Sequence, residues 1–267
     1  MPIKICVAGA TGWTGSAVTR RILQTADFQL VGVIARQSAG RDIGEVLGGP
    51  AAGITIAASL EEVLPAQPDV LIDYTKPDSV KARTLSALDH GVRVVIGTSG
   101  LTADDYREID AHARRQGLGV IAAGNFSLTA ALAKHCALLA ARHLPSWEII
   151  DYAHADKIDA PSGATRELAE ALAEVAPNHL VLPLDQTHGA KEARGATIAG
   201  TQVHSVRLHG YVIAFETIFG LHDERLTIRH DAGAGAEPYV GGTLLAAQRV
   251  MHITGLVRGL DRLLFDA

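Results

Sequence analysis

The sequence has few of the residues on which disulfide-linked, zinc-bound and nucleic-acid-binding proteins rely. Only two of its 267 residues are cysteines, Cys6 and Cys136. Neither belongs to a Cys-x-x-Cys pair, so we predict no disulfide framework and no structural zinc site. Acidic and basic residues alternate at a formal net charge of −5, without the basic stripe that follows a phosphate backbone. These absences argue against nucleic acid as a partner and favour a reducing compartment.

Long apolar runs are also missing. No stretch approaches the length of a membrane-spanning helix, and no basic-then-apolar leader precedes the strand-like start at Ile3. We therefore expect a cytoplasmic protein that does not bind a membrane. Four histidines attract attention as possible metal ligands but lack ligand-type spacing, so we expect no metal; they are His204, His209, His222 and His230. The apolar content of 48% is enough for a packed core without cross-links.

Up to residue 125, short aliphatic runs alternate with helical patterns. The runs predict strands at Ile3–Ala8, Phe28–Ile34, Ile54–Ala57, Asp69–Tyr74, Arg93–Ile96 and Leu118–Ala122. The patterns between them predict helices at Ser16–Gln24, Leu60–Leu64, Asp78–His90 and from Thr102 to Gly117. Gly91 and Gly117 fit left-handed helix ends, and Asp105 fits a capping-box start. This alternation predicts an α/β fold with a doubly wound, mostly parallel sheet covered on both faces.

The pattern changes after Asn125. We predict helices at Leu128–Leu144, Ala164–Val175, Tyr239–Met251 and Leu256–Leu264, a strand at Trp147–Tyr152, a loop over 177–200, and strands over 202–230. No crossover helix fits between the strands of 202–230, so the second sheet should be mostly antiparallel. We therefore expect a second domain of the α+β class, which the resemblance described below implies to be inserted into the first.

The first strand leads into a glycine-rich turn, Gly9, Gly12 and Gly15 in G-x-x-G-x-x-G spacing. Glycines let backbone N–H groups approach a pyrophosphate, and the following helix N-terminus attracts its charge. The position in the first strand-to-helix turn indicates a Rossmann-type domain that binds a nicotinamide dinucleotide. The predicted contacts are Gly9, Ala10, Thr11, Gly12, Trp13 and Thr14. Trp13 either packs over the adenine or covers the start of the helix.

Arg36 follows the second predicted strand, where the adenosine ribose should lie. No carboxylate stands there to hold the two ribose hydroxyls of NAD. An arginine can instead bind the 2′-phosphate of NADP. We therefore expect NADPH as the cofactor, with NADH possible.

Further motifs together point to one family. They are Ile72-Asp73-Tyr74-Thr75-x-Pro77, Gly97-Thr98-Ser99-Gly100, Asn125-Phe126-Ser127, Lys157-x-Asp159-Ala160-Pro161-Ser162-Gly163 and Leu226-Thr227-Ile228-Arg229-His230-Asp231. With these motifs the chain resembles the dihydrodipicolinate reductases of the diaminopimelate–lysine pathway over essentially its whole length. The run Asp159 to Gly163 after a lysine is the most specific signature.

The resemblance implies an architecture and a substrate. Residues 1–125 plus 236–267 would form the dinucleotide-binding domain, and 126–235 would bind the substrate and build a homotetramer. The substrate would be a small cyclic dicarboxylate. The residues near the nicotinamide would be Gly97, Thr98, Ser99, Ala123, Gly124, Asn125 and Phe126.

The substrate loop can also be interpreted from its residues. Ser162, Gly163 and Ala164 open a helix, so their N–H groups should form a carboxylate cradle. Lys157 is close enough in the sequence to supply charge or a proton, and we predict it as the catalytic residue. The resemblance implies that His154 contacts the substrate.

Two departures from the family pattern fall on this loop. Ala153 stands where the family has the first of two adjacent histidines, the group usually assigned as acid/base, and losing such a group typically costs about 10²–10⁴ in rate. The family's Gly-Thr is Gly163-Ala164 here, with Thr165 following. Either a neighbour supplies the proton, or the native substrate does not need one from this side. The first predicts a slow family enzyme and the second a paralogue that reduces another cyclic imine carboxylate.

Other functions share the glycine-rich turn. Semialdehyde and acyl-phosphate dehydrogenases need a nucleophilic cysteine in a loop, whereas Cys6 lies in a predicted strand and Cys136 in a predicted helix. Atypical short-chain reductases need a Tyr-x-x-x-Lys pair, which the sequence lacks. A non-enzymatic NAD(P)-sensing regulator is the remaining alternative, but Lys157 and His154 favour an enzyme. The sequence therefore predicts NAD(P)H-dependent reduction of a cyclic imine or enamine dicarboxylate.

Overall fold

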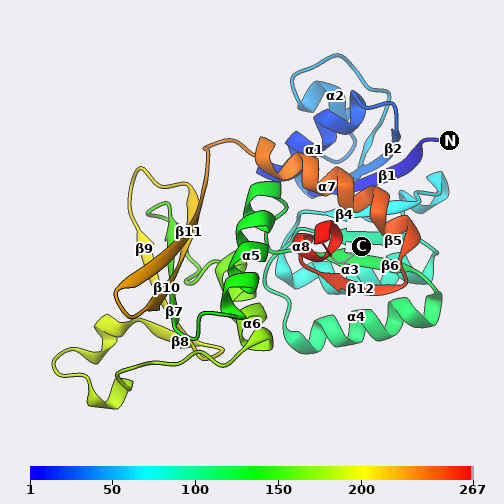
Figure 1. The fold of residues 1–267 in the computed structure, drawn as a ribbon. Helices are drawn as coiled ribbons and strands as arrows, with labels where there is room; N and C mark the ends of the chain where they lie inside the picture. The colour runs from blue at the N-terminus through cyan, green and yellow to red at the C-terminus, as the bar shows by residue number, and fades with distance from the viewer. Residues whose placement is uncertain (266–267) are drawn as a thin grey trace. The chain divides into compact units, whose positions relative to one another are not determined.

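Residues 1–265, described by a computed structural model, form two compact units (Figure 1). One unit comprises Met1–Leu128 and the chain from Ala236 onward, and the other comprises Thr129–Gly235. The roles that we predicted for 1–125 plus 236–267 and for 126–235 stay predictions, and the last two residues of the first set lie outside the described residues.

The first unit contains a seven-stranded sheet in which every strand pair is parallel. Its strand order is β12-β6-β5-β4-β1-β2-β3. The strands are β1 (Ile3–Ala8), β2 (Phe28–Ile34), β3 (Ile56–Ala57), β4 (Val70–Asp73), β5 (Arg93–Ile96), β6 (Gly119–Ala122) and β12 (Gly255–Arg258). All residues of β4 and β6 are buried, as expected for a sheet covered on both faces. The predicted doubly wound parallel sheet is confirmed.

Helices cover both faces of this sheet. They are α1 (Trp13–Leu23), α2 (Ile43–Val46), α3 (Pro77–Asp89), α4 (Ala103–Gln116), α7 (Glu237–Arg249) and α8 (Leu260–Phe265), with short 3₁₀ turns η1 (Arg36–Ser38), η2 (Leu64–Ala66) and η5 (Val250–His252). Residues of α3 and α4 share a core with the strands, while α1 and α7 pack together on the other side (Figure 1). No helix among residues 1–265 is long and apolar enough to cross a membrane.

The helix-end signals were accurate. Thr102 accepts a hydrogen bond from the Asp105 N–H, and the Asp105 side chain accepts one from the Thr102 N–H, so the predicted capping box is present. Gly117 ends α4 in the left-handed region with a φ of 67°, and Gly91 adopts a φ of 78° after α3.

Two predicted helices of this unit are wrong in part. The helix expected at Leu60–Leu64 is a turn followed by η2, because Pro65 has no N–H to donate to the preceding turn. The helix expected at Leu256–Leu264 is the strand β12 followed by α8. β12 pairs with the free edge of β6, a long-range contact that local periodicity does not encode. The strand expected at Ile54–Ala57 shortens to β3.

The second unit holds a five-stranded sheet of order β11-β10-β7-β9-β8. The strands are β7 (Trp147–Ala153), β8 (Ala196–Ile198), β9 (Thr201–Arg207), β10 (Ile213–Leu221) and β11 (Glu224–Ala232). Only β7 and β9 pair in parallel, and the other pairs are antiparallel. The predicted mostly antiparallel sheet is confirmed. The predicted loop 177–200 contains the 3₁₀ turns η3 (Leu184–Gln186) and η4 (Lys191–Arg194) and the edge strand β8, so a plain loop is wrong there.

Two helices, α5 (Leu128–Ala141) and α6 (Gly163–Val175), pack on one face of the second sheet. Ala137, Leu168 and Leu172 from these helices share a core with Trp147 and Phe219 from the strands. β7 alternates strictly between buried and half-buried residues, so its odd-numbered side chains face this core. This alternation decides where Asp151 and Ala153 point.

In the first unit, a buried carboxylate at the end of β4 fixes the loops that follow β4 and β5. Asp73 is fully buried and pairs with Arg83 of α3 at 2.6 Å. Its Oδ1 accepts hydrogen bonds from the Thr75 N–H at 2.9 Å and the Thr75 hydroxyl at 2.6 Å. The Thr98 hydroxyl donates to the same oxygen at 3.1 Å. One carboxylate therefore links two neighbouring strand ends.

Removing this carboxylate should weaken the fold. Asp73→Ala leaves Arg83, whose side chain is only 17% exposed, without its partner, and this should lower the free energy of unfolding by about 3 kcal/mol. The measurement is urea unfolding of both proteins. Arg107→Ala is the matched control, because its pair with Asp104 is exposed at 75% and 80% and should contribute less than about 1 kcal/mol. Equal losses in the two variants would show that the Asp73 network adds little to stability.

Candidate functional site

The predicted cofactor residues of the first unit come together at one edge of the parallel sheet. Carboxyl ends of parallel strands share an edge, and ligands bind where the strand order reverses. Here β1 lies between β2 and β4, so the reversal falls at the turn after β1. The other predicted contacts follow β2, β5 and β6; they are Arg36, Gly97, Thr98, Ser99, Ala123, Gly124, Asn125 and Phe126.

The turn after β1 has the backbone shape that a pyrophosphate needs. Gly9 has a φ of 78°, and a Cβ there would lie 2.2 Å from the Tyr74 carbonyl oxygen. A Cβ on Gly15 would lie 2.1 Å from the Gly9 oxygen. Gly12 is the N-cap of α1, whose first turn carries no acidic residue, and its own N–H donates to the Gly9 oxygen at 2.9 Å. The residues therefore fit a dinucleotide at the N-terminus of α1.

Trp13 covers the start of helix α1. Its ring meets the ring of Tyr239 on α7 edge-on, with centroids 5.6 Å apart, and 55% of the residue is exposed. The sequence allowed Trp13 either to pack over the adenine or to cover the start of the helix, and the structure shows the second arrangement.

The turn after β5 rests on an aromatic side chain. A Cβ on Gly97 would lie 2.1 Å from the Tyr74 ring, which also meets Phe126 edge-on at 6.2 Å. The Tyr74 hydroxyl lies 2.6 Å from the Thr243 hydroxyl of α7, and burial raises the Tyr74 pKa well above its usual range. The Thr98 hydroxyl donates to Asp73. The groups of this turn that could contact a cofactor are therefore mainly backbone atoms and the exposed side chain of Ser99.

The remaining cofactor residues also have defined places. Arg36 is exposed and begins η1, directly after β2. Ala123 donates its N–H to the Ile96 oxygen at 3.2 Å. The Asn125 side chain accepts from the Ser127 N–H at 2.8 Å and so shapes the turn after β6.

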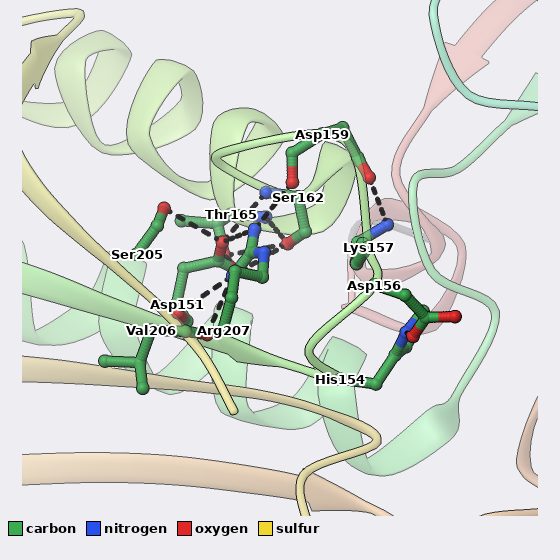
Figure 2. Close-up of polar contacts among 10 residues, drawn as sticks. All are labelled: Asp151, His154, Asp156, Lys157, Asp159, Ser162, Thr165, Ser205, Val206 and Arg207. Atoms are coloured by element: carbon green, nitrogen blue, oxygen red, sulfur yellow. Dashed lines mark hydrogen bonds and ion pairs between the residues drawn. The ribbon is translucent and has the colours of Figure 1, made fainter. Parts of the chain in front are cut away.

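In the second unit, the predicted substrate loop is built around the buried carboxylate of Asp151 on β7. Figure 2 shows Ser162, Thr165 and Arg207 converging on it. The Ser162 N–H and hydroxyl donate to it at 3.0 and 2.7 Å, and the Thr165 hydroxyl donates at 2.9 Å. Ser205 of β9 adds a contact of 3.2 Å.

This arrangement corrects the prediction for Ser162. Its N–H belongs to Asp151, and its hydroxyl caps α6 by accepting from the Thr165 N–H, so Ser162 is not a free donor for a substrate. Gly163 and Ala164 occupy the first turn of α6, where helix N–H groups have no partner within the helix, and they remain candidates for the cradle. The hydroxyl that follows them in the sequence, on Thr165, points into the core.

Arg207 completes the network around Asp151. Its guanidinium donates to the Asp151 carboxylate and to the Asp159 carbonyl oxygen, both at 2.7 Å. Burial raises the pKa of the Asp151 carboxyl, but the hydrogen bonds from Ser162 and Arg207 outweigh it and hold the pKa below its usual value. Asp151 is therefore an ionised structural anion that fixes both ends of the loop between Asp159 and Ser162.

Lys157 and His154 lie on one turn after β7. The Lys157 N–H donates to the His154 oxygen at 3.2 Å. The Lys157 ammonium lies 2.5 Å from the Asp159 carboxylate, and Nδ1 of His154 lies 2.5 Å from the Asp156 carboxylate. Figure 2 shows these two pairs on the side of the loop away from Asp151. The turn therefore presents a cation and an imidazole, each with its own carboxylate.

Ala153 ends β7 on the same face as Asp151 and is fully buried. Its strand neighbours are Ile213 and Arg207. A methyl group at this position closes the core and cannot exchange a proton.

Sequence reasoning missed Asp151 and Arg207. A signal for Asp151 was available: a carboxylate at an inward position of an alternating strand is uncommon unless it is paired. Arg207 could not be found from the sequence, because its register against β7 depends on the crossover through α6. Asp156 was one of the proton sources that the sequence allowed, beside His154, Lys157 and water, but no signal predicted its contact with Nδ1 of His154.

The described residues give no support to two alternative chemistries, a nucleophile at Cys6 and a metal site. Cys6 is fully buried in β1, and burial raises its pKa to about 12, so it cannot serve as a nucleophile. Within residues 1–265, no three acidic, histidine or cysteine side chains gather as a metal site would require. His204, one of the four histidines considered as metal ligands, instead forms a hydrogen bond with Glu148 at 2.8 Å.

Comparison with known proteins covers both units. Residues 3–126 match the model of the dihydrodipicolinate reductase N-terminus, and residues 126–264 match that of its C-terminus. A 4-hydroxy-tetrahydrodipicolinate reductase of Moorella thermoacetica is 41% identical over 98% of both chains. One from Enterococcus faecalis is 38% identical over 98% of this chain and 100% of its own.

A solved structure agrees with these matches. Dihydrodipicolinate reductase from Paenisporosarcina sp. TG-14, bound to dipicolinate, superposes with a TM-score of 0.81 at 32% identity and covers 98% of this chain and 99% of its own. An amine dehydrogenase from Mycobacterium smegmatis, at 17% identity and a TM-score of 0.69, shares the fold. The resemblance predicted from the motifs is confirmed: the chain belongs to the dihydrodipicolinate reductase family.

Proposed function

We propose that this chain is a 4-hydroxy-tetrahydrodipicolinate reductase of the diaminopimelate–lysine pathway that uses NADPH in preference to NADH. Membership of the family makes it an oxidoreductase. The observation that carries the proposal is the combination, in one chain, of the glycine turn before α1 with the Lys157 turn and the first turn of α6.

The first unit would hold the cofactor. The turn Gly9–Thr14 would bind the pyrophosphate, because backbone N–H groups and the α1 N-terminus favour negative charge. Arg36 would bind the 2′-phosphate, and the turns at Gly97–Ser99 and Ala123–Phe126 would border the nicotinamide. A reduced nicotinamide, when bound, supplies a hydride.

The second unit would hold the substrate. The Paenisporosarcina relative is bound to dipicolinate, a planar cyclic dicarboxylate, which supports the same class of substrate here. One carboxylate would accept from the N–H groups of Gly163 and Ala164, and Lys157 would supply the countercharge. Asp151 and Arg207 keep the loop in place, so binding does not have to order it.

A second candidate function is reduction of another small cyclic imine carboxylate. It is favoured by Ala153, which is buried and has no proton to give. The predicted homotetramer and cytoplasmic location also remain proposals.

A direct assay separates these functions. NADPH oxidation by the purified protein should depend on the freshly generated pathway intermediate, and Lys157→Met should lower kcat/KM on the order of 10²-fold because the countercharge is lost. Lys191→Met is the control, since this exposed lysine donates to the Asp185 carbonyl oxygen and is not a predicted site residue. Turnover of another cyclic imine carboxylate, without turnover of the pathway intermediate, would favour the second candidate. NADPH binding without turnover of any compound would indicate a regulator.

Cofactor binding should depend on Gly12. A Cβ there would lie 3.1 Å from the Gly9 oxygen, against 2.1 Å for a Cβ on Gly15, and the side chain of Gly12→Val would occupy the pyrophosphate position. We expect NADPH affinity to fall on the order of 100-fold, about 2.7 kcal/mol, in a fluorescence titration, with little change in the unfolding midpoint. Gly15→Ala, which meets backbone at 2.1 Å, should instead destabilise the fold. Wild-type affinity in Gly12→Val would contradict the assignment.

Arg36 should set the preference between the two cofactors. Arg36→Ala removes charge-assisted hydrogen bonds to the 2′-phosphate, so NADPH should bind roughly 10- to 100-fold more weakly, while NADH affinity should hardly change. Arg36→Lys should recover part of the loss, because it restores charge without the bidentate fork. Equal effects on NADPH and NADH in titrations would show that Arg36 does not read the 2′-phosphate.

A further inference from the structure

We propose that His154 donates the proton of the reduction and that Asp156 positions its imidazole for this task, an inference that rests on the proposed function. Nδ1 of His154 lies 2.5 Å from the Asp156 carboxylate. A ring nitrogen held by a carboxylate leaves the other, Nε2, as the one that can present a proton outward. His154 is half-exposed, so this nitrogen can reach a ligand.

The reaction requires such a donor. The activated double bond of the substrate takes a hydride, with its two electrons, at the electrophilic end. The electron pair of that bond moves to the other end and forms a bond with a proton. The N–H bond of the protonated His154 breaks in this step and leaves a neutral imidazole, which solvent protonates again. Charge and atoms balance with one hydride and one proton per turnover.

The other polar groups of the loop are committed elsewhere. Asp151 is ionised and accepts hydrogen bonds on both carboxylate oxygens. Lys157 is paired with Asp159 and supplies the cation that a dicarboxylate needs. Ala153 has a methyl group in the core. An imidazole is the general acid that enzymes use most often, so His154 is the side chain of this turn that suits proton donation.

Asp156 carries the negative charge that is needed to hold the imidazole of His154 in position. The hydrogen bond from His154 lowers the pKa of the Asp156 carboxyl, and the nearby His209 contributes in the same direction. Lys157 and its partner Asp159 are further charged groups beside this pair. Because Asp156 is mostly exposed, the pair adds little to stability, and its effect falls on the orientation and charge of the imidazole.

The chain contains a matched control for this pair. His222 and Asp223 lie on the turn between β10 and β11, with Nδ1 3.3 Å from the carboxylate and both side chains more than nine-tenths exposed. They reproduce the chemistry of the His154–Asp156 pair on a turn that carries no predicted site residue.

The first test is the pH dependence of kcat/KM on the substrate that the wild type reduces. His154→Gln should lower kcat on the order of 10²-fold or more. Asp156→Asn should move the alkaline limb to lower pH by roughly 0.5 to 1 unit, because a donor loses its proton more readily without a neighbouring negative charge. Asp156→Glu should restore the limb, and Asp223→Asn should leave it unchanged. An alkaline limb that is the same in Asp156→Asn as in the wild type would overturn the role of Asp156.

The second test does not depend on turnover. The imidazole signal of His154, identified by its loss in His154→Gln, is followed by NMR during titration with dipicolinate. We expect this signal to shift on binding, and that of His222 to stay in place. If the chemical shift of the His154 imidazole does not change when dipicolinate binds, the inference is wrong even if the enzyme is active. Conversely, a wild type without turnover on any cyclic imine carboxylate refutes the proposed function, while the NMR result still decides whether His154 meets the ligand.

Discussion

Backbone atoms of three segments approach one another around Gly9, and the arrangement of the first unit depends on this contact. The Gly9 Cα faces the Tyr74 carbonyl after β4, and the Gly9 oxygen faces Gly15 in α1. A side chain at either glycine would separate β1 from β4 or from α1. Glycine at these positions allows the close packing. It also leaves the backbone of the predicted cofactor turn accessible at the point where the strand order reverses, so the fold and the predicted turn have the same requirement.

Buried carboxylates extend this logic to the neighbouring loops. Asp73 at the end of β4 binds an arginine and two hydroxyls from outside its strand. Asp151 in β7 binds an arginine and three such hydroxyls. A buried charge is costly unless it is paired and hydrogen-bonded, so the loss of one partner should destabilise the loops that each network connects. Asp73 connects the turns after β4 and β5, and Asp151 connects Ser162 with Arg207.

The predicted substrate loop contains Ala153 at the position where the resemblance implies an acid/base histidine. Ala153 and His154 are adjacent, but the alternation of β7 sends the first into the core beside Asp151 and leaves the second on the solvent-facing turn. The imidazole that remains is oriented by Asp156, and the cation beside it by Asp159. In the proposed mechanism, proton donation depends on a side chain outside the strand, while a methyl group occupies the core position.

The sequence predicted the features that depend on local spacing. The strands β1, β2, β4, β5 and β6 of the parallel sheet, the capping box at Thr102 and the left-handed Gly117 follow from short-range rules of hydrogen bonding and steric freedom. The glycine spacing predicted a cofactor turn, and the run from Lys157 to Gly163 predicted a substrate loop and indicated the family, which the comparisons confirm.

Tertiary structure decided what depends on distant partners. β12 exists because β6 offers an unpaired edge, although its residues read locally as helix. Ser162 was expected to face a substrate, but Asp151 lies beneath it and takes its N–H. Arg207 reaches Asp151 only because β9 pairs in parallel with β7. Periodicity describes which way a side chain points from its own element, whereas its partner is fixed by strand register, and register is set by the packing of the whole unit.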